Sequence, residues 1–66
     1  MKTTVIGLGL IGGSIARDMR KSGFATELIG VEANDSHAKK ALEIGLVDRI
    51  ETLENGVSNT DLVIIA

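Results

Sequence analysis

The 66-residue sequence predicts an α/β domain with a parallel β-sheet, and two observations carry this prediction. Apolar, β-branched runs alternate with amphipathic segments of helical period, and a glycine-rich turn joins the first run to the first amphipathic segment. Strands that alternate with helices in this way pair in parallel through right-handed crossovers. We expect one domain at most, because a chain this short builds only a small core.

The first strand is expected at Thr3–Ile6, a β-branched run that ends at a glycine. In the helix that follows the turn, Ile11, Ile15 and Met19 recur at every fourth position, which predicts one apolar stripe. Gly23 is placed to end this helix, after last turns rich in arginine and lysine.

The second strand is expected at Glu27–Glu32, and a second amphipathic helix follows it. Asn34, Asp35 and Ser36 are all suited to the N-cap of that helix, and Gly45 is placed to end it. Its apolar side is expected to consist of Ala38, Ala41 and Leu42.

The last part of the chain predicts two more strands. A brief third strand is expected within Leu46–Leu53, where Val47, Ile50 and Leu53 alternate with polar residues. Glu54–Asn59 predicts a turn or a single helical turn, and Asp61–Ala66 predicts a fourth, fully apolar strand. Because that apolar run ends without a turn, cap or tail, we expect residues 1–66 to be the amino-terminal portion of a larger domain.

Composition argues against several classes of function. Hydrophobic residues make up 44% and charged residues 24%, as in a globular protein, and no cysteine is present. We expect no metal site, and the absence of cysteine fits a cytoplasmic protein. The net charge of −2 is dispersed and Phe24 is the only aromatic residue, so neither a nucleic-acid partner nor an anionic membrane is expected.

The turn reads Gly7-x-Gly9-x-x-Gly12, a pattern that is weak evidence alone but strong in this context. It follows an expected strand and opens an expected helix, and Glu32 lies about 20 residues beyond Gly12, at the end of the next strand. These conditions define the dinucleotide fingerprint of a Rossmann-type domain. The expected fold is therefore a truncated Rossmann-type sheet, strand–helix–strand–helix–strand–strand, with strand order 3-2-1-4.

Each fingerprint position has a physical role. Gly7 permits the tight turn, Gly9 lets the backbone approach a pyrophosphate, and Gly12 allows close packing of the helix. Backbone N–H groups near Leu10 and Ile11 are expected to point at the phosphates from the positive end of the helix.

Glu32 is expected to bind the adenosine ribose hydroxyls and to repel a 2′-phosphate. Neither Ala33 nor Asn34, which follow it, is an arginine that could bind one. The sequence therefore favours NAD over NADP.

Structural explanations stand beside these functional ones. The glycines could form a turn without a ligand, and Glu32 could be a solvated strand-end acid. Ser14 could donate to a phosphate or bond locally, whereas Gly30 is better explained by packing. His37, the only histidine, is expected at the surface rather than as a general base.

The chain resembles the opening of prephenate dehydrogenases. The resemblance is carried by Gly7-Leu8-Gly9-Leu10-Ile11-Gly12-Gly13-Ser14 with Ile15-Ala16, by Gly30-Val31-Glu32-x-Asn34, by Ala41-x-x-x-Gly45-x-x-Asp48 and by Asp61–Ala66. It implies an enzyme of tyrosine biosynthesis that oxidises prephenate with NAD, or with NADP in some members, and decarboxylates it to 4-hydroxyphenylpyruvate; a close variant acts on arogenate. One departure is Glu32, where the family more often has aspartate.

The resemblance also implies that the catalytic histidine, the substrate-binding arginine and a helical dimerisation domain lie beyond Ala66. We therefore expect no catalytic residue within the chain, which alone would be inactive. Three alternatives remain: another dehydrogenase of the β-hydroxyacid type, which usually has methionine where Ile11 stands; a flavoprotein; and a non-catalytic NAD-sensing module.

Overall fold

The computed structural model describes residues 1–58 and 60–66. In order along the chain, the elements are β1 (Lys2–Ile6), α1 (Leu10–Lys21), β2 (Glu27–Val31), α2 (Asp35–Glu43), β3 (Arg49–Ile50), α3 (Leu53–Val57) and β4 (Leu62–Ile65). Part of the turn expected at Glu54–Asn59 is the end of α3, and Asn59 itself lies outside the described residues.

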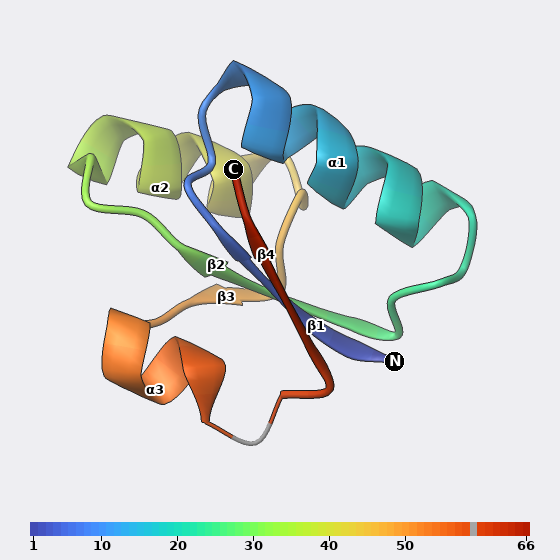
Figure 1. Ribbon diagram of the computed structural model, residues 1–66. Coiled ribbons are helices and arrows are strands. Elements are labelled where there is room, and N and C mark those ends of the chain that lie inside the picture. The colour runs from blue at the N-terminus through green and yellow to red at the C-terminus, as the bar shows by residue number, and fades with distance from the viewer. Residues whose placement is uncertain (59) are drawn as a thin grey trace.

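The strands form one parallel sheet in the order β3-β2-β1-β4, which confirms the expected topology. Helices α1 and α2 cover one face of the sheet, and α3 lies on the other (Figure 1). Strands β1, β2 and β3 therefore follow one another toward one edge of the sheet, and the chain then returns to place β4 on the other side of β1. The carboxyl ends of β1 and β4, where ligands bind in open α/β sheets, lie next to each other at this switch point.

Helix α1 packs on the sheet mainly through small residues beside the predicted apolar stripe, and Met19 of that stripe packs against the core. Gly12 and Ala16 are its buried residues, Ile15 and Met19 are half-buried, and Ile11 is 71% exposed. Small side chains allow the helix to sit close to the sheet, and this turns the buried face away from Ile11. The expected apolar stripe is therefore buried only in part, because Ile15 and Met19 are half-buried and Ile11 is not.

Helix α2 is capped by Asn34, whose Oδ1 accepts the His37 backbone N–H at 3.0 Å, and Gly45 follows its end with φ +71°. Ala41 is buried as expected, whereas Leu42 is 46% exposed and does not join the core. The expected apolar side was therefore partly wrong, because the short helix buries a narrower face than its hydrophobic residues cover.

Strand β3 is only two residues long, and Leu53 begins α3 instead of extending the strand. Thr52 explains this end, because its side chain accepts the Asn55 N–H at 3.2 Å and caps α3. Just before β3 begins, a carboxylate oxygen of Asp48 accepts the Leu28 N–H at 2.8 Å. This side-chain bond replaces a backbone bond of the sheet, so β3 does not start earlier.

The centre of the sheet buries two threonines beside Val5, Leu28 and Ile29. Thr3 and Thr4 are both fully buried, and they differ in how their hydroxyls are bonded. The Thr4 hydroxyl donates to the Gly56 carbonyl on α3 at 2.5 Å, whereas the Thr3 hydroxyl donates to Met1 at 3.4 Å.

We therefore expect Thr4→Val to lower the free energy of unfolding by about 1–3 kcal/mol, since the buried Gly56 carbonyl loses its partner. Thr3→Val is the matched control, and its effect should be smaller because the bond it removes is long. Chemical unfolding of the two variants measures the difference. Equal losses would contradict this account of how α3 is held.

Candidate nucleotide-binding site

The turn after β1 is held at the carboxyl edge of the sheet by its first glycine. Gly7 has φ +90°, a conformation that L side chains rarely adopt, and its N–H donates to the Val31 carbonyl at 2.8 Å. A Cβ at Gly7 would also lie 3.2 Å from the carbonyl oxygen of Ala66. Both the backbone conformation and the space therefore require glycine here.

Gly9 ends the turn and is the N-cap of α1. A Cβ added there would meet no atom within 4 Å, so the backbone is open to its surroundings. It borders a hollow of about 350 Å³. This hollow is lined by Gly7, Gly9, Leu10, Ile11, Gly12 and Ala66.

The first turn of α1 offers backbone donors to this hollow. Gly9 has no side chain to cap the helix, and no acidic residue lies in the first turn. The first N–H bonded within the helix is that of Gly13, which donates to the Gly9 carbonyl at 2.8 Å. The N–H groups of Leu10, Ile11 and Gly12 therefore lack helical acceptors and lie at the positive end of the helix dipole, an arrangement that binds anions.

Gly12 brings the helix onto the turn itself. A Cβ at this position would overlap the carbonyl oxygen of Gly7 and would lie 3.2 Å from the Ala66 Cβ. The close approach expected from the sequence is present, and its partners are the turn and the end of β4. In Figure 1 the carboxyl terminus lies beside the start of α1.

Glu32 follows β2 directly and reaches back to the glycine turn. One carboxylate oxygen accepts the Leu8 N–H at 2.5 Å, and the other accepts the Asn34 N–H at 2.9 Å. These two bonds, with a smaller contribution from the charge of His37, hold the pKa of Glu32 below its ordinary value. The carboxylate is thus ionised and fixed beside the turn, a contact that the sequence motif did not reveal.

Stability should fall in acid because two carboxylates accept backbone hydrogen bonds. The Leu28 N–H, and then Arg20, lower the pKa of Asp48, as the bonds to Asn34 and Leu8 lower that of Glu32. A lowered folded-state pKa gives stability that is complete above the unfolded pKa and is lost as pH falls through the folded one.

The ordinary pKa values of these groups are 4.5 for glutamate and 3.8 for aspartate, so the loss should begin below about pH 4.5. Melting temperatures followed from neutral pH into acid test this. In Glu32→Gln and Asp48→Asn the melting temperature should fall less steeply as the pH is lowered. Glu43→Gln, at an exposed position on α2, should leave this pH dependence unchanged. If neither Glu32→Gln nor Asp48→Asn changed the pH dependence of the melting temperature, these two carboxylates would not be the source of the acid sensitivity.

The other residues singled out in the sequence do not join this site. A Cβ at Gly30 would lie 2.5 Å from Leu8 Cδ1 and 3.0 Å from Ile50 Cδ1, so this glycine serves packing, as expected. The Ser14 hydroxyl donates locally to the Leu10 carbonyl at 3.0 Å. Asp61 accepts the Lys2 N–H at 2.9 Å, at the end of the sheet opposite the glycine turn.

His37 is exposed on the first turn of α2, as expected. Within the described residues, no helix is long and apolar enough to cross a membrane.

A glycine turn, an anion-binding helix start and a strand-end carboxylate, on a parallel sheet of order 3-2-1-4, define a nucleotide-binding domain of the Rossmann type. The family model for the nucleotide-binding domain of prephenate dehydrogenase matches residues 15–66. The chain belongs to this family.

Two relatives agree with the family match. The chain is 42% identical over 69 aligned residues to prephenate dehydrogenase of Bacillus subtilis (strain 168), covering 100% of the chain and 19% of that protein. It also superposes, with TM-score 0.83 and 30% identity, on prephenate dehydrogenase from A. aeolicus in complex with hydroxyphenyl propionate and NAD+. That match covers 98% of the chain and 24% of the solved one, so the chain spans a minor part of each relative.

Proposed function

We propose that this chain is the amino-terminal, NAD-binding portion of a prephenate dehydrogenase. The observation that carries the proposal is the open backbone of Gly9 beside free helix N–H groups, with the Glu32 carboxylate fixed across the same turn. The family match and the NAD+ complex of the A. aeolicus relative support the choice of cofactor. They also favour this family over the flavoprotein and the sensor.

The chain's own residues fit such a cofactor. The N–H groups of Leu10 and Ile11 would hold the pyrophosphate, and Gly9 would let it approach. Gly7 and Gly12 fix the shape of the turn, and Glu32 would accept hydrogen bonds from the ribose hydroxyls. When bound, NAD supplies a hydride acceptor to a substrate positioned beside its nicotinamide.

In this proposal the protein oxidises prephenate and decarboxylates it to 4-hydroxyphenylpyruvate, a step of tyrosine biosynthesis in the cytoplasm. Residues 1–66 would be the first part of the Rossmann domain. The catalytic histidine, the substrate-binding arginine and a helical domain for dimerisation would belong to the rest of the protein. NAD reduction with prephenate, compared with arogenate, tests the substrate on the full-length protein; turnover of neither substrate would refute it.

Selectivity for NAD should depend on the charge of Glu32. We expect Glu32→Ala to weaken NAD binding about ten-fold or more and to narrow the preference over NADP, because both the ribose bonds and the repulsion of a 2′-phosphate are lost. Calorimetric titration of the full-length protein with each nucleotide measures both effects.

Glu32→Gln separates the two roles of this side chain. Its amide oxygen can still accept the Leu8 N–H, so the turn is kept, while the charge that rejects a 2′-phosphate is removed. NADP affinity should therefore rise in this variant. If the unaltered protein bound NADP as tightly as NAD, the assignment of Glu32 would be wrong.

A further inference from the structure

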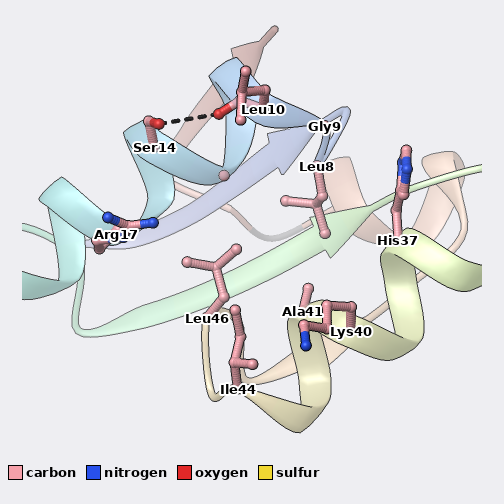
Figure 2. Close-up of a pocket in the computed structure, with 11 residues that line it drawn as sticks. Leu8, Gly9, Leu10, Ser14, Arg17, His37, Lys40, Ala41, Ile44 and Leu46 are labelled. Carbon is pink, nitrogen blue, oxygen red and sulfur yellow. Dashed lines mark hydrogen bonds between the residues drawn. The ribbon is translucent and has the colours of Figure 1, made fainter.

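A second concave surface lies between α1 and α2, on the helical face of the sheet. It consists of two hollows, of about 200 Å³ and about 320 Å³, that share Arg17, Ile44 and Leu46 and so form one continuous groove. Figure 2 shows the first of these hollows, with Arg17 on α1 and Lys40 on α2 on opposite sides and Leu46 between them.

The floor of the groove is apolar and accessible. Leu46 is half-buried, while Ile44, just after α2, is 58% exposed. Leu10 closes the upper end and is 90% exposed. An exposed apolar surface framed by polar residues is a common feature of protein-interaction sites.

The rim of the groove is basic, although the chain as a whole carries a net charge of −2. Four of its seven lysines and arginines line the two hollows, together with the only histidine, whereas none of its nine acidic residues does. Of the four, Arg20 is already paired with Asp48 at 3.1 Å. Across the described residues, Arg17, Lys21 and Lys40 form no ion pair.

The basic side chains follow helical spacing on both sides. Arg17 and Lys21 are four residues apart on α1, and His37 and Lys40 are three apart on α2, so each pair lies along one helix face. The twelve residues of α1 extend about 18 Å, and residues from Leu10 at its start to Lys21 at its end line the groove. A site this elongated suits a segment of polypeptide better than a compact metabolite.

We propose that the α1–α2 groove binds an acidic amphipathic helix of a partner protein. Apolar side chains of that helix would lie on the floor formed by Leu8, Ile44 and Leu46, as in other helix-in-groove complexes. Its aspartates and glutamates would pair with Arg17, Lys21 and Lys40 along the rim. The groove meets the nucleotide site at Gly9 and Leu10, which line both, and it extends away from that site along the facing sides of α1 and α2.

The test uses a capped 14-residue helical peptide with leucine at positions spaced by three and four and glutamate elsewhere. A peptide with lysine in place of every glutamate is the control. Each is titrated into the isotope-labelled protein, and backbone amide shifts report where it binds. We expect the acidic peptide to shift amides along α1 and α2, and the basic peptide to shift none.

Two neighbouring charge reversals on α2 separate the groove from general electrostatics. Lys40 lines the groove and Lys39 does not, although both are exposed on the same helix. Lys40→Glu should weaken the acidic peptide about five-fold or more, and Arg17→Glu should do the same, whereas Lys39→Glu should change little. Equal weakening by Lys39→Glu, or no binding of the acidic peptide, would overturn the proposal.

Discussion

Replacing Gly9 by valine is expected to weaken NAD binding at least about 100-fold while leaving thermal unfolding almost unchanged. Gly9 has φ −70° and ψ −159°, an extended conformation that a β-branched residue adopts without strain. No protein atom lies within 4 Å of the added Cβ, so the fold has nothing to displace. The side chain instead fills the space proposed for the pyrophosphate.

Calorimetric titration and a melting curve on the same preparation of the full-length variant measure both halves of this prediction. Gly9→Ala should give a smaller loss of affinity, because one methyl group fills less of the space. Normal NAD affinity in the valine variant would mean that the turn is merely structural. A large fall in melting temperature would mean that the space beside Gly9 belongs to the packed fold.

Replacing Gly12 by alanine is expected to cost about 3 kcal/mol or more of unfolding free energy. The new Cβ would overlap the Gly7 carbonyl oxygen, which is backbone and cannot rotate away as a side chain can. Relief requires α1 to move off the turn, and that movement opens the core around Ala16.

Gly13 provides the matched control on the same helix. A Cβ there would meet Leu46 Cδ2 at 3.6 Å, an ordinary contact. Gly13→Ala should therefore keep or raise stability by about 0.5–1 kcal/mol, because alanine favours the helix. Chemical unfolding compares the two variants. Equal stability of Gly12→Ala and Gly13→Ala would contradict the close approach of α1 to the turn.

The fold could be predicted from sequence because its signals are local. Strand and helix periods, the helix-ending glycines Gly23 and Gly45, and the spacing from the glycine turn to Glu32 lie in short stretches of chain. The strand order followed from the type of domain that these signals define. The positions of Gly7, Gly9 and Gly12 at the carboxyl edge followed in the same way.

What could not be predicted depends on partners that are distant in sequence. Ile11 is exposed because Gly12 and Ala16 allow α1 to pack through its smallest face, and the helical period does not reveal this choice. The bond from Leu8 to Glu32 joins residues 24 positions apart, and a motif that records spacing contains no hydrogen bonds.

The α1–α2 groove was missed for the same reason. Its cations come from two helices, and on one helix alone Arg17 and Lys21 resemble an ordinary solvated helix end. Only the packing of α2 beside α1 places Lys40 across from Arg17 with aliphatic residues between them, as Figure 2 shows.

The most direct test of the central claim is to titrate NAD into the isotope-labelled protein and to map the backbone amide shifts. The account predicts the largest shifts at Leu8, Gly9, Leu10, Ile11 and Gly12, with a second group at the end of β2 near Glu32, and weak or no shifts with NADP at equal concentration. Absence of shifts in the glycine turn, or shifts confined to Arg17, Lys40, Ile44 and Leu46 in the α1–α2 groove, would contradict it.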